Sequence, residues 1–161
     1  MSWSNLIKQV NGGEYDEYRL REFAHEIHAV TDLGSTAMHF AVIAGCLESV
    51  KYLHGIDPTK IYQENCFGET PLHWACKAPD SSDIVQFLIN HCATIFERDT
   101  DGNTPLHWAA EYDRADLLPF FLTAETKVLL ELKNFNDESP LDLARYHSSA
   151  EFLRYLREVK L

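Results

Sequence analysis

The octet GNTPLHWA at residues 102–109 is one of four similar phrases that recur along this chain of 161 residues. It resembles GETPLHWA at 68–75 closely, GSTAMHFA at 34–41 in part and DESPLDLA at 137–144 more loosely. The hydroxyl residues of these phrases, Thr36, Thr70, Thr104 and Ser139, follow one another after 34, 34 and 35 residues. A fixed period of this length indicates an array of repeated structural units.

Each phrase contains residues that begin a helix. The leading glycine suits a tight turn with a positive φ angle, and the threonine or serine offers an oxygen that caps a helix. Proline at positions 71, 105 and 140 then takes the first helical position, where its missing N–H is no loss. A second, more hydrophobic helix is predicted after a short break, in LESVKYL at 47–53, DIVQFLI at 83–89, ADLLPFFL at 115–122 and AEFLRYL at 150–156.

One such helix pair cannot bury its own apolar face, so the units must stack. The pattern G-x-T-P-L-H-x-A, opening a helix–turn–helix unit of about 33 residues, resembles the ankyrin repeat. The resemblance implies an all-α solenoid of stacked helix-turn-helix units with projecting β-turn fingers and no deep catalytic cleft. We predict four repeats within residues 31–161, at about 31–64, 65–98, 99–133 and 134–161.

Several positions depart from the repeat pattern. Ala37 replaces proline in the first phrase, and in the last phrase Asp137 replaces the turn glycine and Asp142 replaces histidine. The last two changes suit a terminal unit with relaxed requirements. Pro119 lies inside the second helix of the third unit, which predicts a late start or a kink there.

Residues 1–30 carry no phrase but read as helix, turn and helix: SWSNLIKQV, NGG and EYDEYRLREFAHEIHAV. A degenerate N-terminal capping repeat is one interpretation, and a short separate motif is the other. The face predicted for the second helix consists of Tyr15, Leu20, Phe23, Ala24 and Ile27.

Composition limits the classes of function. The formal net charge of −11 disfavours phosphate backbones and anionic lipid, so we expect no nucleic-acid and no membrane partner. No stretch reads as a signal peptide or approaches about 20 apolar residues. The four cysteines form no C-x-x-C pair, which predicts reduced thiols and a cytoplasmic location, or the host cytosol or nucleus for a pathogen effector or viral protein.

The eight histidines predict no catalytic or metal site. His39, His73 and His107 fall one to a unit, so they cannot converge on one site, and the family resemblance implies that their ring nitrogens tie the fingers together. No nucleophile elbow, phosphate-binding loop or zinc-binding motif occurs. We therefore predict no catalytic residues, no metal and no cofactor.

The family resemblance places a binding surface on the concave side of the stack. Trp74, Trp108, Tyr112 and Tyr146 would form a run of large rings, which are the residue types that anchor protein interfaces. The two tryptophans could instead pack between repeats, and the sequence leaves both interpretations open. The remaining candidates come from the fingers and the rim: Leu33, Phe67, Glu69, Asp101 and Glu111.

An aromatic centre with an acidic rim fits a partner protein that offers a basic or amphipathic segment. The predicted function is a protein–protein interaction module that binds or sequesters a partner through its concave face and fingers, as an inhibitor or a pathogen effector would. The alternative is an enzyme or metal-binding protein built on a repeat scaffold.

Overall fold

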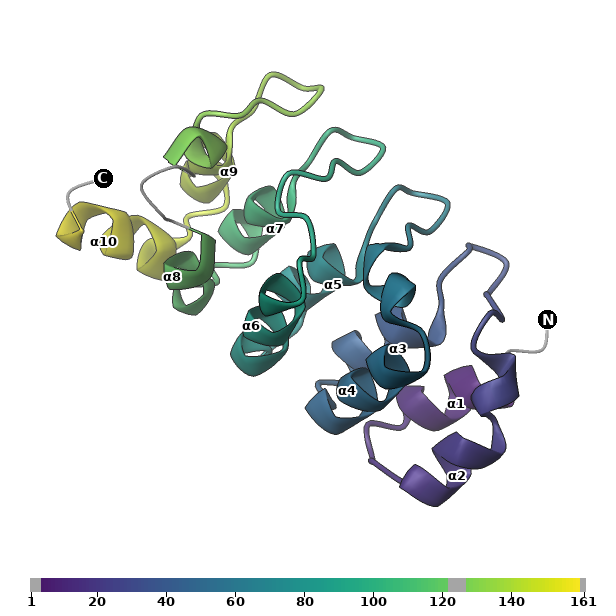
Figure 1. Cartoon of the computed structure of the whole chain (residues 1–161). Coiled ribbons are helices and arrows are strands. Elements are labelled where there is room, and N and C mark those ends of the chain that lie inside the picture. Colours follow the sequence, from purple (N-terminus) through teal and green to yellow (C-terminus); the bar gives the residue numbers. More distant parts are fainter. Residues whose placement is uncertain (1–3, 122–126, 160–161) are drawn as a thin grey trace.

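The computed structural model describes residues 4–121 and 127–159 of the chain. Paired helices stack side by side in sequence order, and long loops project from the stack in one direction (Figure 1). The first helices of the pairs are α1 (Asn5–Asn11), α3 (Ala37–Ile43), α5 (Pro71–Lys77), α7 (Pro105–Glu111) and α9 (Pro140–Tyr146). The second helices are α2 (Glu17–Glu22), α4 (Leu47–Ile56), α6 (Ser82–Asn90), α8 (Leu118–Phe121) and α10 (Ala150–Glu158).

Within these described ranges the chain forms no β-strand, and its β pairing is limited to an isolated bridge between Val30 and Thr36. The predicted all-α solenoid with projecting fingers is therefore confirmed. Four short 3-10 helices, which the sequence did not predict, lie at η1 (Ala24–Glu26), η2 (Pro58–Tyr62), η3 (Ala115–Leu117) and η4 (Lys127–Leu130). Three residues at the ends of predicted helices, Ser2, Trp3 and Leu122, lie outside the described residues.

The breaks between paired helices lie where the sequence predicts them. Gly45, Asp80, Asp113 and Ser148 follow the first helices of their units and adopt φ angles of 71°, 50°, 55° and 58°. Left-handed backbone ends a helix and reverses the chain direction, which lets each second helix return along the first. Helices α5 and α7 then pack against each other, as do α3 and α5, and α7 and α9.

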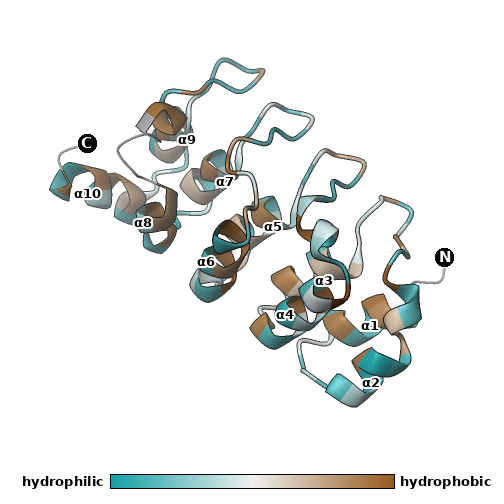
Figure 2. Cartoon of the chain, viewed as in Figure 1, coloured by the Kyte–Doolittle hydropathy of each residue, from teal (hydrophilic) through white to brown (hydrophobic). Residues whose placement is uncertain are grey.

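The core lies where neighbouring helix pairs meet. Leu72 on α5 and Leu106 on α7, the leucines of the repeated phrase, are completely buried. Figure 2 shows hydrophobic residues concentrated on the helices, whereas α2 and much of the fingers are hydrophilic. Packing within and between the pairs therefore supplies most of the apolar burial.

The predicted second helix of the N-terminal region is wrong in its extent. Helix α2 ends at Glu22, and the chain then forms η1 and the first finger. Tyr15 precedes the helix and is exposed, whereas Leu20 and Ile27 are buried. Glu26 lies in η1, and its carboxylate accepts a hydrogen bond of 3.0 Å from the backbone N–H of Leu6.

That bond satisfies a free N–H in the first turn of α1 and ties the segment after α2 to the start of α1. The boundaries between units, at about residues 31, 65, 99 and 134, stay a prediction.

Two of the departures from the repeat pattern have clear structural counterparts. Pro119 lies in the first turn of α8, after the 3-10 turn η3, so the predicted late helix start is confirmed. Asp137 adopts a φ angle of 63°, close to the 69° of Gly68 and the 80° of Gly102. The last finger therefore has the same turn as the others, built on a residue that carries a side chain.

Asp142 takes over the helix-capping role of the phrase histidine. Its Oδ2 accepts hydrogen bonds of 3.0 Å from the backbone N–H of Ser139 and 2.6 Å from the Nζ of Lys133. The hydrogen bonds from Lys133 and Ser139 hold the pKa of this carboxyl well below its usual range. The last unit keeps its cap and contributes no ring nitrogen to a further finger.

Candidate functional site

The fingers are tight turns, each closed by its own backbone. In the second finger the N–H of Asn65 donates to the carbonyl of Glu69 over 3.0 Å, and the N–H of Gly68 donates to the carbonyl of Asn65 over 3.0 Å. The side-chain Oδ1 of Asn65 also accepts from the N–H groups of Phe67 and Glu69. These bonds satisfy the turn locally, so the finger keeps its shape away from the helices.

The same arrangement recurs because one position recurs. Three residues before the turn glycine or its substitute, the sequence places Thr31, Asn65, Asp99 and Asn134. Each side-chain oxygen accepts a backbone N–H within its own finger. Sequence analysis missed these residues, although aligning the units on the glycine would have found them.

Consecutive fingers are joined through their tips. The N–H groups of Cys66, Thr100 and Phe135 donate to the carbonyls of the preceding tips over 2.8, 2.8 and 2.9 Å. The accepting carbonyls belong to Leu33, Phe67 and Asp101. The fingers thus form one continuous row along the same side of the molecule (Figure 1).

The phrase histidines add a second link between units, as predicted. The Nδ1 atom of His73 accepts the backbone N–H of Thr70 over 3.1 Å, so the proton of the neutral ring lies on Nε2. That Nε2 donates to the carbonyl of Asn103 in the next finger over 3.1 Å. His39 and His107 bond in the same way to the carbonyls of Glu69 and Glu138.

Burial controls the ionisation of these rings. Because all three side chains are fully buried, desolvation lowers their pKa values, to about 4 for His39 and His107. The rings stay neutral at physiological pH and act as structural links between units.

Two hollows lie where the fingers meet the first helices. The first, of about 430 Å³, lies between the first two fingers, and the second, of about 220 Å³, lies between the next two. Phe67 and Glu69 line both hollows, so the two hollows adjoin at these residues and together make up a groove along the fingers. We call it the finger groove, and its lining also includes Leu33, Phe40, Trp74, Asp101, Trp108, Glu111 and Tyr112.

The two tryptophans of the groove belong partly to the packing between repeats. The Trp74 ring meets the rings of His39 and Phe40 edge to face, with centroids 5.2 and 5.6 Å apart. Its indole N–H donates to the carboxylate of Glu69 over 2.7 Å. The ring is half-buried, so it packs on the preceding unit and still borders the groove.

Trp108 repeats this arrangement one unit later. Its indole N–H donates to Asp99 over 2.9 Å, and its ring lies 5.9 Å from that of His73. Tyr112, 41% exposed, lies 6.3 Å from the Trp108 ring. The Nζ of Lys77 sits 5.9 Å from the Trp108 ring and 5.6 Å from the Tyr112 ring. This pair of rings therefore already holds a cation at the distance of a cation–π contact.

Of the residues predicted to bind a partner, all but Tyr146 line the finger groove. Leu33, Phe67, Glu69 and Trp74 line its first half, and the second half also includes Asp101, Trp108, Glu111 and Tyr112. Tyr146 is 80% exposed on the last unit, where its ring packs on His147 at 5.1 Å. The structure thus gathers the predicted aromatic and acidic residues over three fingers but does not bring Tyr146 to them.

Within residues 4–121 and 127–159, no group of three or more His, Cys, Asp or Glu side chains is placed to hold a metal ion. None of the helices in these ranges has the length and apolar character needed to cross a membrane.

Comparisons with known proteins agree with the repeated pattern. A family model for a single ankyrin repeat matches residues 33–61, and a model for three copies of the ankyrin repeat matches residues 54–127. Together the two matches span residues 33–127, which is more than half of the chain. Comparison with curated proteins finds no match.

Proposed function

This chain belongs to the ankyrin-repeat family, and from that premise we propose that it binds or sequesters a partner protein through its concave face and fingers. Repeats of this family are generally protein–protein interaction modules and are typically not catalytic. The finger groove is the part of the surface best suited to that role, because it combines aromatic rings, acidic groups and three tied fingers.

The contact of Lys77 with two rings is the observation that carries the proposal. The ammonium group of Lys77 lies at cation–π distance from Trp108 and Tyr112, two rings that line the groove. A basic side chain of a partner could contact the exposed face of Tyr112 in the same way. Asp101 and Glu111, which line the same half of the groove, add negative charge around it.

The partner that fits is a protein with a basic or amphipathic segment. The net charge of −11 favours its approach over long distances, and the aromatic rings supply the apolar contact area. We place this binding in the cytoplasm, because Cys46, Cys66, Cys76 and Cys92 are all unpaired. Sequestering of this kind is the action of an inhibitor or of a pathogen effector.

Residues 1–30 fit the proposal as a degenerate capping repeat. Helix α1 packs against α3 as α3 packs against α5, which is the relation between neighbouring repeats. The outward-facing α2 carries exposed Glu17, Arg19 and Arg21, as expected of a unit whose other face meets water.

Titration with a basic amphipathic peptide tests the groove. The probe is a synthetic helix of about 18 residues, with leucines on one face and lysines beside them. Truncating a central aromatic anchor typically costs about 2 kcal/mol, so Tyr112→Ala should bind the peptide about 30-fold more weakly than wild type. Asp101→Lys should weaken binding at low salt and much less at high salt, because added salt screens an exposed charge.

Tyr18→Ala is the matched control, since Tyr18 is 82% exposed on α2, outside the finger groove, and should leave binding unchanged. Capture from lysate with the same three proteins then selects partners, which are retained by wild type and Tyr18→Ala and lost with Tyr112→Ala. Equal binding by wild type and a folded Tyr112→Ala would contradict the proposed anchor.

A further inference from the structure

Every internal helix pair has its apolar face covered by the next pair. On the first helices Leu72 and Leu106 are completely buried, and on the second helices so are Val85 and Leu118. Helices α5 and α6 contact α7 and α8 of the next unit, and in that next unit α7 and η3 contact α9 and α10. The array itself thus establishes what occupies these positions: a helix from the following unit.

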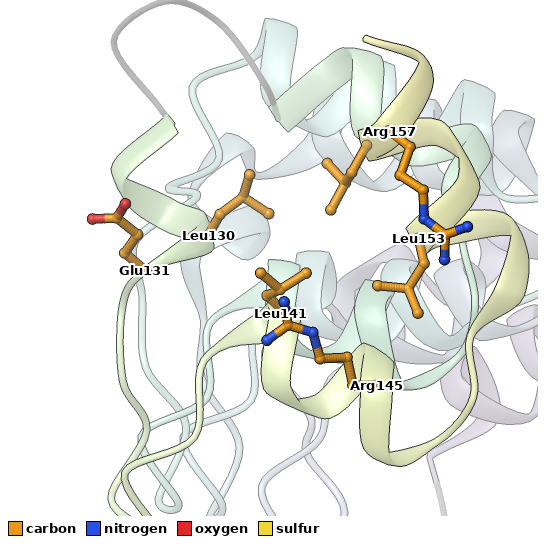
Figure 3. Close-up of a pocket in the computed structure, with 7 residues that line it drawn as sticks. Leu130, Glu131, Leu141, Arg145, Leu153 and Arg157 are labelled. Carbon is orange, nitrogen blue, oxygen red and sulfur yellow. The ribbon is translucent and has the colours of Figure 1, made fainter. Parts of the chain in front are cut away.

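The last pair has the same positions but is not covered by a later helix among the described residues. Leu141 corresponds to Leu72 and Leu106, and Leu153 corresponds to Val85 and Leu118, yet both are only half-buried. Together with Leu130 and Leu156 they line a hollow of about 470 Å³ between η4, α9 and α10 (Figure 3). We call this the terminal hollow.

The charge at the terminal hollow is opposite to that of the finger groove. Arg145 and Arg157 line it, and Figure 3 shows both side chains beside the leucines. Glu131, the one acidic residue among the described residues that line the hollow, points away from them. Arg145 is 65% exposed and lies 3.8 Å from Asp142, and no ion pair found within the described ranges includes Arg157.

We propose that the terminal hollow is a second docking site, which takes an amphipathic helix of a partner protein that carries acidic residues beside its apolar face. The apolar face of that helix packs on the four leucines in the place that the next repeat takes elsewhere in the array. Its carboxylates meet Arg145 and Arg157. A helix fits because helices cover every equivalent position in the array, and acidic groups fit because the rim is cationic in a chain with a net charge of −11.

The test uses a synthetic helix of about 18 residues with a leucine stripe flanked by glutamates, and a counterpart with lysines in place of the glutamates. Fluorescence anisotropy should give a Kd for the glutamate peptide of about 100 µM or tighter with the wild-type chain. Arg157→Glu should weaken this binding about tenfold, because it turns an attraction into a repulsion, and should strengthen binding of the lysine peptide at this end.

Arg154→Glu is the matched control on the same helix. Arg154 pairs with Glu151 and Glu158 and does not line the terminal hollow, so its reversal should leave binding of the glutamate peptide unchanged. Tyr112→Ala should also leave it unchanged, which separates this site from the finger groove. Both Arg157 and Arg154 are exposed, so both variants should fold, although Arg154→Glu should melt slightly below wild type because it faces Glu151 and Glu158 on the same helix.

Three outcomes would overturn the proposal. The glutamate peptide fails to bind the wild-type chain, or Arg154→Glu weakens its binding as much as Arg157→Glu does. In the third, sedimentation reveals a dimer that Arg157→Glu dissociates and the peptide does not displace, in which case the occupant is a second copy of the chain.

Discussion

Replacing His107 by glutamine should make the chain less sensitive to mild acid. The ordinary pKa of histidine, 6.5, applies in the unfolded chain, whereas burial lowers the pKa of His107 in the folded chain to about 4. The unfolded state therefore binds a proton first as the pH falls. The contribution of neutral His107 to the free energy of unfolding is fully present above about pH 6.5, and it is lost as the pH falls from about 6.5 to about 4.

The size of the effect follows from the two pKa values. Between about pH 7.5 and pH 5.5, protonation of the unfolded chain at this one residue removes about 1.3 kcal/mol from the free energy of unfolding. His39 has a similar pKa and acts in the same direction. Protonation of the histidines should therefore lower the free energy of unfolding of the wild-type chain by at least about twice that amount.

Glutamine has an acceptor and a donor that can replace the bonds to Thr104 and Glu138, and it does not titrate. Since the replacement geometry is imperfect, His107→Gln should unfold about 1 kcal/mol more easily than wild type near pH 7.5.

Urea unfolding at the two pH values measures this difference directly. The loss of stability on acidification should be about 1.3 kcal/mol smaller in His107→Gln than in wild type. His28→Gln is the control for the substitution itself, because the His28 side chain is 77% exposed. If wild type and His107→Gln lose equal stability on acidification, His107 is not held neutral by burial and the reasoning is refuted.

Three further predictions concern the helices and turns. Leu106→Ala should lower the free energy of unfolding by about 2–5 kcal/mol in urea titrations. Leu141→Ala, at the half-buried equivalent position, should lower it clearly less, and equal losses would contradict the assigned burial. Gly102→Ala should lower the free energy of unfolding by about 1–3 kcal/mol, because φ is +80° and the new Cβ would lie 2.9 Å from a backbone nitrogen. Gly45→Ala should cost less, because its φ is +71° but no atom lies near the new Cβ. Asp137→Gly should stabilise the fold by roughly 0.5–1 kcal/mol and raise the melting temperature by a few degrees, since Asp137 has a φ of 63°. A lower melting temperature would mean that the aspartate side chain stabilises the turn by more than its backbone strain costs.

Most of the fold could be predicted because its determinants are local and repeated. The glycine, threonine and proline of each phrase set a turn, a cap and a helix start within a few residues, and the structure places α5 and α7 where the phrase predicts them. The extent of α2 could not be predicted in this way. The segment that follows α2 is tied to α1 by a bond between Glu26 and Leu6, which are 20 residues apart and belong to no recognisable pattern.

The candidate site was predictable only in part, because it also depends on contacts between residues that are far apart in the sequence. The repeat register places Trp74 and Trp108 on one side of the array, but their packing depends on rings from the preceding unit and on the carboxylates of Glu69 and Asp99. The sequence could not indicate how these groups would pair in space. The terminal hollow also could not be predicted from the sequence, since Arg145 and Arg157 lie on two different helices.

The ties between finger tips use backbone carbonyls, and the residues that carry them are leucine, phenylalanine and aspartate. Leu33, Phe67 and Asp101 accept nearly the same hydrogen bond, at 2.8, 2.8 and 2.9 Å, while their side chains remain exposed. Mutation at these tips can therefore change hydrophobicity and charge without breaking the tie. Evolutionary drift can therefore alter the chemistry of the finger tips without breaking the ties between them, and a protein engineer could diversify the same three positions as a library.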